Sequence, residues 1–549
     1  MRNKIITLLA SITIAAGLAY LFRVELVLFG ISTLTDQRTT IGETQTVEWQ
    51  TGPEGTRQSD RPNVVLIVAD DLGWNDLTFN GGGVAQGSVP TPNIDSIAKD
   101  GVNFTNGYAG QGTCAPSRAM MMSGRYGSRF GFEFTPTPPG MATALNLMSS
   151  ADSNKPANIL TEDPKQVSFD DMGLPASEVT IAELLKDQGY YTAHIGKWHL
   201  GRTNGSAAHD QGFDQSLLMR SGLYGEEDDP NIVNSKLSYD PIDRFLWAGM
   251  RYASSYNGGG AFKPGDYITD YYTDEAVKVI ENNKNRPFFL YLAHWAPHTP
   301  LQATKADYDA LSHIKDHTER VYAAMIRALD RGVGRVLDTL KENGLDENTI
   351  VIFTSDNGGA GYVGIDDLNK PFRGWKITNF EGGIHVPYFV KWPKQIPAGG
   401  IYDKPVHHFD IYATAADAAG AEIAEDHKLD GVSLLPYAQG TATTEKPHDT
   451  LFWRAGDYRT VRHHDWKLAV DPLMGNTFLF DLATDPGEST NVAAQNPEVV
   501  AEIKQLLVKH NSEMVPPNWE SVAAMSINVD KHLREEPDAK TDTYIYWGN

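Results

Sequence analysis

Four short apolar runs, each followed by polar side chains, place the strongest limit on how this chain can fold. Their β-branched and aromatic residues are typical of strands that are buried on both faces. The four predicted strands span residues 63–69, 190–195, 287–293 and 349–353. Helical patterns lie between them, over residues 180–188, 270–283 and 317–342. This alternation predicts an α/β fold with a large, mostly parallel central sheet flanked by helices.

Each predicted strand is followed by a group of polar side chains. In chain order these groups are Asp70 with Asp71, Lys197 with His199, His294 with His298, and Asp356 with Asn357. A single Asp after a strand is most often a helix cap or a turn former, but capping alone does not explain four such groups. Open α/β sheets bind their ligands at the carboxyl edge. The sequence therefore predicts a functional site at this edge.

The candidate metal ligands among these groups are Asp70, Asp71, Asp356 and Asn357, which offer only oxygen atoms. Such a set suits a hard divalent cation, Ca²⁺ or Mg²⁺, whereas zinc is normally bound by His or Cys. The adjacent carboxylates of Asp70 and Asp71 repel one another unless a cation lies between them. A solvated turn is the alternative interpretation of either pair taken alone.

The charge balance limits the class of ligand. The chain has 47 Lys and Arg against 70 Asp and Glu, which gives a net charge of −23. This balance argues against nucleic acid as a partner. An anionic substrate would have to be bound by a local positive pocket, because the overall field repels it.

The N-terminal segment differs from the rest of the chain. Basic residues precede an apolar run over residues 5–22, and a second, mostly apolar stretch covers residues 24–31. This pattern predicts either an export signal or an uncleaved membrane anchor within residues 5–31, and therefore a periplasmic or extracellular protein.

The texture of the sequence predicts four parts. They are the signal or anchor over residues 1–31, a polar linker over 32–60, a catalytic domain over 61–445, and a smaller C-terminal subdomain with a charged tail over 446–549. Short strand-like pieces from about Leu451 and a closing helix from Ala501 indicate that this subdomain is α+β with an antiparallel sheet.

Cys114 is the only cysteine of the chain, so no internal disulfide can form. Taken alone, it is explained as a small buried hydrophobe, as a reactive nucleophile, or as a residue that is modified later. It begins the run CAPSR, residues 114–118, which precedes three methionines and Ser-Gly-Arg. A chance Cys-x-Pro-Ser-Arg in a chain of this length has a probability of only about a few in a thousand.

The run from Cys114 to Arg125 resembles the signature of the type I sulfatase family, Cys-x-Pro-Ser-Arg followed by a run that ends in Ser/Thr-Gly-Arg. Gly196–Gly201 is similar to the family's Gly-Lys-Trp-His-Leu-Gly segment without a departure. Other segments that resemble the family are residues 70–71, 297–301, 355–359, Lys376 ahead of Glu381-Gly-Gly, 465–468 and 482–491. The resemblance covers roughly residues 61–510, and the arylsulfatase branch is the most similar.

This resemblance implies the alkaline phosphatase/sulfatase fold and a sulfuric ester hydrolase. In the family, a formylglycine-generating enzyme linked to export oxidises the cysteine to Cα-formylglycine. The hydrated aldehyde attacks sulfur beside a divalent cation, the alcohol leaves, and a sulfated hemiacetal then releases sulfate as the aldehyde reforms. Carried over to this chain, the metal ligands are Asp70, Asp71, Cys114, Asp356 and Asn357, with Ca²⁺ expected and Mg²⁺ as the alternative.

The resemblance also assigns roles to basic side chains. Arg118 and Lys197 would hold the diol and neutralise the sulfate, and His199 would act as the base for its hydroxyl. Lys376 and His298 would contact the sulfate oxygens and protonate or polarise the leaving oxygen.

Several alternatives stay open. His294 competes with His298 for its role, and His385 stands where many relatives carry an arginine. A phosphonate monoester or phosphodiester hydrolase of the same superfamily would use the same groups, and a non-catalytic binding protein on this fold would keep an unmodified thiol. The substrate, an aryl, carbohydrate or alkyl sulfate with a carbohydrate favoured, depends on the loops over residues 130–170 and 201–266.

Overall fold

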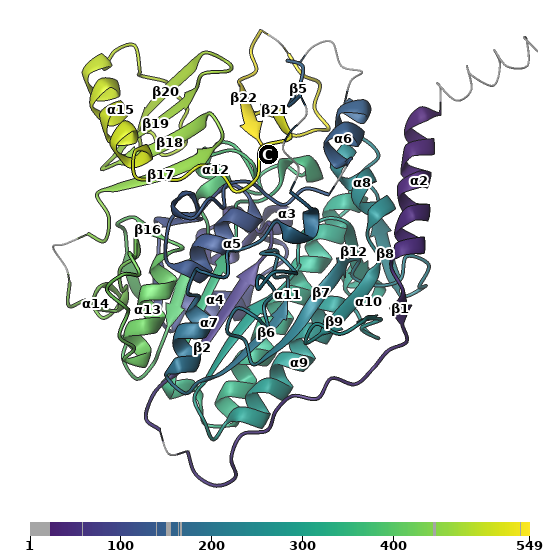
Figure 1. Cartoon of the computed structure of the whole chain (residues 1–549), viewed down its shortest axis with the longest axis vertical. Coiled ribbons are helices and arrows are strands. Elements are labelled where there is room, and N and C mark those ends of the chain that lie inside the picture. The colour runs from purple at the N-terminus through teal and green to yellow at the C-terminus, as the bar shows by residue number, and fades with distance from the viewer. Residues whose placement is uncertain are drawn as a thin grey trace, which may run out of the picture.

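A central eleven-stranded sheet forms the frame of the molecule (Figure 1). The computed structural model describes residues 22–549 except 58, 139, 150–154, 163, 165, 166, 443–445 and 539. In spatial order the strands of this sheet are β1 (Ile41–Gly42), β10 (Ala261–Phe262), β9 (Tyr252–Tyr256), β7 (Gln215–Gly222), β6 (Tyr191–Gly196), β11 (Phe288–Ala293), β2 (Asn63–Ala69), β13 (Thr349–Ser355), β14 (Tyr388–Lys391), β3 (Val102–Phe104) and β15 (Gly400–Tyr402).

The five central strands, from β7 through β6, β11 and β2 to β13, are parallel, and antiparallel pairs flank them on both sides. This arrangement confirms the predicted fold class. The four predicted strands correspond to β2, β6, β11 and β13, with ends that differ by at most two residues.

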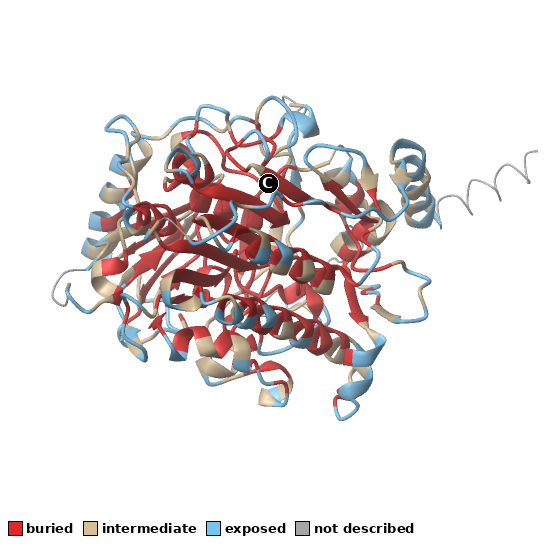
Figure 2. Cartoon of the chain, turned by 90° about the horizontal axis from the view of Figure 1, so that it is seen from below, coloured by how far each residue is buried: buried red, intermediate tan, exposed pale blue. Residues whose placement is uncertain are grey.

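Helices cover both faces of the sheet. Alternate residues of β2 belong to different cores: Val65 and Ile67 pack on one face, and Val64 and Leu66 on the other. Helices α4 (Pro92–Lys99), α9 (Ile268–Asn283) and α11 (His317–Glu342) cover the first face, and α5 (Cys114–Ser123), α7 (Ile181–Asp187) and α13 (Asp410–Ala419) cover the second. Figure 2 shows most of the sheet as a buried layer, with the exposed residues mainly on the outer sides of the helices and in the loops.

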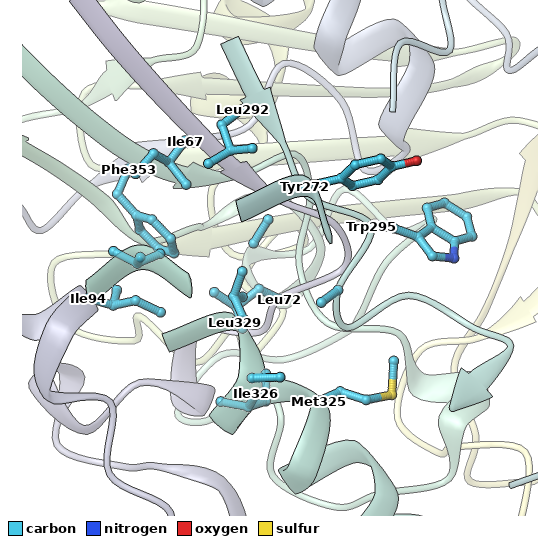
Figure 3. Packing of buried hydrophobic residues seen from close by; sticks show 14 of the residues in the cluster. Ile67, Leu72, Ile94, Tyr272, Leu292, Trp295, Met325, Ile326, Leu329 and Phe353 are labelled. Carbon is cyan, nitrogen blue, oxygen red and sulfur yellow. The ribbon is translucent and has the colours of Figure 1, made fainter. Parts of the chain in front are cut away.

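The packing on the first face is apolar and interlocked (Figure 3). Ile67, Leu292 and Phe353 come from three neighbouring strands and contact the same cluster as Ile326 and Leu329 of α11. All of these side chains are fully buried. Because β2, β11 and β13 are covered on both faces, their sequences are continuously apolar, and this is the pattern that made them recognisable.

The smaller subdomain forms a second sheet, seen at the upper left of Figure 1. It consists of β17 (Thr450–Ala455), β18 (Tyr458–His463), β19 (Trp466–Asp471) and β20 (Asn476–Asp481), all antiparallel, and is covered by α15 (Pro497–Asn511). The predicted antiparallel sheet and closing helix are thus present.

Other short elements of the chain are α3 (Val84–Gly87), α6 (Met141–Ser149), α8 (Pro241–Gly249), α10 (Lys305–Ala310), α12 (Glu381–Ile384), α14 (Leu435–Ala438), β4 (Gly107–Tyr108), β8 (Ile232–Ser235), β12 (Leu301–Thr304) and β16 (Val406–His407).

The predicted charged tail is in fact folded. Strands β21 (Ala523–Asn528) and β22 (Tyr544–Gly548) pair with each other and with β5 (Ile159–Leu160), a short strand in the loop over residues 130–170. The side chains of Ile545 and Trp547 are buried. The prediction missed this small sheet because its third strand comes from a segment more than 350 residues earlier, which no local pattern reveals.

The predicted polar linker is also packed against the main domain. Helix α2 (Arg23–Arg38) crosses the expected boundary at residue 31, β1 joins the central sheet, and Val47 and Trp49 are buried. Val47 and Trp49 are thus the buried apolar side chains of this otherwise polar stretch. Residues 1–21, which hold most of the predicted signal or anchor, lie outside the described residues. Within the described part of the chain, every helix is too short or too polar to cross a bilayer.

A buried ion network joins the two parts of the molecule. Lys467 of β19 lies 2.8 Å from Glu381 at the start of α12 and 2.9 Å from Glu488, and all three side chains are almost fully buried. Glu381 also accepts from His385, 2.7 Å away. Burial would raise the pKa of Glu381, but Lys467 and then His385 outweigh it and lower that pKa.

Replacement of Lys467 by methionine should therefore be strongly destabilising. Lys467→Met leaves two buried carboxylates without their cation, and we expect the free energy of unfolding to fall by about 3–5 kcal/mol. Chemical denaturation measures this change. Lys305→Met, which breaks an exposed pair with Asp309, is the control and should cost less than about 1 kcal/mol. Equal losses for the two variants would contradict a structural role for the buried network.

Candidate active site

The register of the central strands brings the predicted polar groups together. Ala69 of β2 pairs with Ser355 of β13, so the next residues, Asp70 and Asp356, leave the sheet side by side. In the same way Gly196 of β6 pairs with Ala293 of β11, and Lys197 follows at the same edge. The predicted site at the carboxyl edge is therefore a real juxtaposition of side chains.

Arg118 lies between the two carboxylates. Its Nε donates to Asp356 Oδ2 at 2.8 Å and its Nη2 to Asp70 Oδ2 at 3.2 Å, and all three side chains are fully buried. Nη1 donates to the carbonyl of Lys197 and to the hydroxyl of Tyr291. Burial alone would lower the pKa of Arg118, but Tyr291 and the carboxylates raise it. These hydrogen bonds of Arg118 hold the carboxylates of Asp70 and Asp356, both predicted metal ligands, in place. A direct contact of Arg118 with substrate stays a prediction.

Cys114 is the first residue of helix α5, all ten residues of which are buried. The free N–H groups at a helix N-terminus favour an anion at this point. The Cys114 Sγ lies 3.5 Å from His199 Nδ1. Burial raises the pKa of the Cys114 thiol, with Lys197 and Lys376 offsetting this only in part. Reactive cysteines have a lowered pKa, so thiolate chemistry is disfavoured here.

Lys197 and His199 border Cys114 from the end of β6. The Lys197 Nζ lies 2.7 Å from Asp70 Oδ2 and 4.6 Å from the centre of the Trp295 ring. His199 is partly accessible. Burial, followed by the charges of Lys197 and Arg118, lowers the pKa of His199 well below its ordinary value. A neutral imidazole next to Cys114 is able to accept a proton there.

His298 and Lys376 form a second pair, which lies beside Asp71. The Lys376 Nζ donates to Asp71 Oδ2 at 2.7 Å and lies 3.1 Å from His298 Nε2. His298 Nδ1 lies 2.5 Å from the carbonyl oxygen of Thr299 and donates to it. Because that bond fixes the proton on Nδ1, Nε2 is left as the acceptor for Lys376. The Trp295 ring stacks on His298 at 3.8 Å.

The charges of this pair are set by their surroundings. Burial and then the charges of Lys376 and Lys197 lower the pKa of His298 well below its ordinary value. Burial would also lower the pKa of Lys376, but the carboxylate of Asp71 outweighs it and raises that pKa well above its ordinary value. Lys376 therefore keeps its positive charge, and His298 is neutral.

His294 does not share this environment. Among the described residues, neither of its ring nitrogens has a hydrogen-bond partner, and burial lowers the pKa of His294 to about 4. His385 lies behind the site, where it bonds to Glu381 and stacks on Phe372. The geometry favours His298 over His294 and gives His385 a packing role.

The oxygen-rich pocket fits a divalent cation. Ligand atoms of Asp70, Cys114 and Asp356 lie within 4.8 Å of one another, as do those of Asp70, Asp71 and His298. Asp70 Oδ1 is buried without a hydrogen-bond partner among the described residues. Burial and then the charge of Asp356 raise the pKa of Asp70 to about 7, a strain that a cation would relieve.

Asn357 completes this pocket. Its Nδ2 donates to Asp71 Oδ1 at 2.8 Å. That bond leaves Asn357 Oδ1 buried and, within the described chain, without a partner. An amide oxygen is a suitable ligand for Ca²⁺. These short distances and the Asn357–Asp71 hydrogen bond thus link the five predicted metal-ligand positions to one another.

Backbone strain coincides with the site. Asp71, His199 and Ile377 have φ values of 63°, 64° and 83°, in the left-handed region that residues other than glycine rarely occupy. Each either is a site residue or adjoins one. Such conformations persist where the surrounding structure holds a side chain in a functional orientation.

Three site residues gave no signal in the sequence. The Tyr362 hydroxyl donates to Asp71 Oδ2 at 2.9 Å and accepts from Lys376, Tyr291 bonds to Arg118, and Trp295 underlies Lys197 and His298. Tyr291 lies within an apolar strand and Trp295 just after it, where aromatic residues are ordinary core. Tyr362 lies in a single 3-10 turn, Gly361–Val363, whose sequence has no pattern. Only their contacts distinguish them.

Known proteins are similar to this chain in sequence and in fold. The sulfatase family model matches residues 62–421, and a model described as N-sulphoglucosamine sulphohydrolase, C-terminal, matches residues 374–513. An uncharacterized sulfatase of Escherichia coli K12, YdeN, is 31% identical, with 86% of this chain and 90% of that protein covered. The N-acetylgalactosamine-6-sulfatase of Mus musculus is 33% identical, with 78% and 76% covered.

A solved structure is also similar. The crystal structure of Ps i-CgsB in complex with k-i-k-neocarrahexaose superposes with a TM-score of 0.68 at 32% identity, and the match covers 84% of this chain and 94% of that one. The fold and the site together define an enzyme of the alkaline phosphatase superfamily. Within it, the chain belongs to the sulfatase family.

The two histidines of the β11 loop provide a direct test of the site. His298→Asn should lower kcat/KM for a sulfate ester by about 100-fold or more, because it removes the partner of Lys376. His294→Asn, the matched control from the same loop, should change it by less than about threefold. Steady-state kinetics with thermal melts of both variants separate catalysis from folding. Equal losses of activity at equal stability would contradict this assignment.

Proposed function

We propose that this enzyme hydrolyses sulfate monoesters, with a formylglycine derived from Cys114 as nucleophile and a divalent cation beside it. The observation that carries the proposal is the place of Cys114. It begins a buried helix, 3.5 Å from His199, and the charges of Lys197 and Lys376 both act on it. Arg118, Lys197 and Lys376 balance the carboxylates of Asp70, Asp71 and Asp356. A divalent cation would therefore give this site the net positive charge that an anionic sulfate requires in a chain of net charge −23.

The proposed modification explains the chemistry of residue 114. A hydrated formyl group supplies an oxygen nucleophile where the protein otherwise offers a protonated thiol. The run CAPSR in residues 114–118 supports conversion by a formylglycine-generating enzyme. Export to the periplasm or the extracellular space, with residues 5–31 as signal or anchor, is part of the same proposal.

The proposed cation is Ca²⁺, with Mg²⁺ as the alternative. Asp70, Asp71, Asp356 and Asn357 would hold it, with residue 114 as a further ligand, and the two unpartnered oxygens of Asp70 and Asn357 support this set. When bound, the cation neutralises charge on the nucleophile and the sulfate. Arg118 keeps two of these carboxylates apart and oriented.

The remaining site residues have separate roles in the proposed reaction. Lys197 and Lys376, whose charges both act on residue 114, neutralise the sulfate oxygens. His199, held neutral, takes the proton from the hydroxyl group that residue 114 carries once modified and hydrated. Lys376, oriented by Asp71 and His298, polarises the leaving oxygen. The protein thus offers separate groups for the nucleophile and for the leaving group.

We favour a carbohydrate sulfate as substrate. One similar protein is an N-acetylgalactosamine-6-sulfatase, and another was crystallised with a neocarrahexaose, so both are named with carbohydrates. A phosphonate monoester or phosphodiester hydrolase is the second candidate, because the same cations and oxygen ligands suit a phosphoryl group equally well.

A comparison of two aryl esters tests the reaction class. We expect kcat/KM for 4-nitrophenyl sulfate to exceed that for a 4-nitrophenyl phosphonate monoester by at least about tenfold, a difference of about 1.4 kcal/mol in transition-state binding. A much faster phosphonate reaction would instead favour the second candidate. Detection of released sulfate by ion chromatography confirms that the sulfate ester is hydrolysed.

Metal removal tests the cation. Chelation should abolish sulfate ester hydrolysis, and added Ca²⁺ should restore it. Asp356→Asn should raise the Ca²⁺ concentration needed for half-maximal activity by at least about tenfold, because one charged ligand is lost. Asp338→Asn, an exposed change on α11, is the charge-matched control. Activity that responds neither to chelator nor to Ca²⁺ would exclude the proposed metal site.

A further inference from the structure

Two arginines near the candidate active site, Arg202 and Arg220, lack a carboxylate partner. Within the described part of the chain, no Asp or Glu forms an ion pair or a hydrogen bond with either guanidinium. The Arg202 guanidinium lies 5.7 Å from the centre of the Phe169 ring. The nearby Asp171 is already engaged, because its Oδ1 accepts from Asn204 at 2.7 Å.

The backbone holds Arg202 close to the active site. It follows His199 by three residues, so its Cα lies at most about 11 Å from that of His199. The segment between them is fixed: the carbonyl of Leu200 accepts from Leu174 N at 2.8 Å. Gly201 has a φ of 106°, and a Cβ there would lie 2.1 Å from Ser206 Oγ. Arg202 thus has little freedom to move away from the site.

Arg220 reaches the same region from the neighbouring strand. Its strand, β7, pairs in parallel with β6, and Leu218 lies beside Gly196, the residue before Lys197. The pairing of β7 with β9 is irregular between Met219 and Ser221, so Arg220 sits at a bulge. Bulges re-aim side chains and are common beside active sites.

The end of β7 contacts Trp295, one of the residues of the candidate active site. Two residues after Arg220, the carbonyl of Gly222 accepts from Trp295 Nε1 at 2.8 Å. The Trp295 ring in turn lies under Lys197 and stacks on His298. Arg220 therefore lies near the carboxyl end of β7, and Arg202 lies six residues beyond Gly196, the last residue of the neighbouring strand β6.

The two positive charges also influence each other. Arg202 is exposed to solvent, yet burial, followed by the charge of Arg220, lowers the pKa of Arg202 to about 10. Asp170 offsets the repulsion only as a minor influence. Arg125 and Arg129, by contrast, have carboxylate partners at 2.8 and 2.6 Å.

We propose that Arg202 and Arg220 bind a second anionic group of the substrate, a sulfate or a carboxylate, while the scissile sulfate lies at residue 114. An anion between the two guanidiniums removes their repulsion, and the planar fork of arginine matches both kinds of oxyanion. The inference rests on the proposed function and narrows it: the substrate is a glycan with at least two anionic groups near each other.

Kinetics with matched substrates test this site. Arg202→Gln, Arg220→Gln and the double variant are compared with wild type on three sulfate esters: 4-nitrophenyl sulfate, a disulfated disaccharide, and a disaccharide with one sulfate and one uronate. For the dianionic sugars, we expect each substitution to raise KM roughly tenfold or more with kcat little changed. Turnover of the aryl sulfate, which has no second anion, should change by less than about twofold. Arg335→Gln, an exposed arginine of α11 paired with Asp274, is the charge-matched control.

The outcomes are distinct. A loss confined to one dianionic sugar supports the site and identifies the anion as sulfate or as carboxylate. A double variant with wild-type KM for both dianionic sugars would overturn the inference, as would a wild type that binds a monosulfated disaccharide as tightly as the disulfated one. If wild type cleaves no sulfate ester at all, the proposed function itself fails, independently of the two arginines.

Discussion

The buried Arg118, with Asp70 on one side and Asp356 on the other, is the interaction on which the rest of the site depends. A fully buried guanidinium is tolerated only with partners of opposite charge, and buried carboxylates of like charge repel one another unless a cation separates them. The two contacts, 3.2 and 2.8 Å long, join β2 and β13 to helix α5. Because Cys114 stands one turn before Arg118 on that helix, the same contacts hold the proposed nucleophile position beside the proposed metal ligands.

Further ion pairs surround this central one. Lys197 and Lys376 each pair with one of the adjacent carboxylates, Asp70 and Asp71, so the side chains that we propose to neutralise the sulfate are oriented before it binds. Behind them, the Lys467 network ties the smaller sheet to Glu381, five residues after Lys376. Preorganised charge of this kind costs stability in the free protein and acts when charge develops on the bound ester. The left-handed backbone at Asp71 and His199 is consistent with that cost.

Much of the fold could be predicted because its central strands are buried on both faces. Runs such as residues 63–69 and 349–353 are continuously apolar, and their carboxyl ends place the polar residues at one edge by topology alone. The tail strands β21 and β22 were missed because their partner, β5, is distant in sequence, and the linker because its buried Val47 and Trp49 are isolated. Tyr362 and Trp295 show the same limit within the site. Their types are ordinary for core or loop, and only the fold brings them to Lys376 and Lys197.

The proposed chemistry requires that residue 114 acts as an aldehyde and not as a thiol. Peptide mass spectrometry of the segment around Cys114 distinguishes the two, on active protein from a host that has a formylglycine-generating enzyme. We expect formylglycine at residue 114, with specific activity that rises in proportion to the modified fraction across preparations. Fully active protein in which this residue is an unmodified cysteine would contradict it.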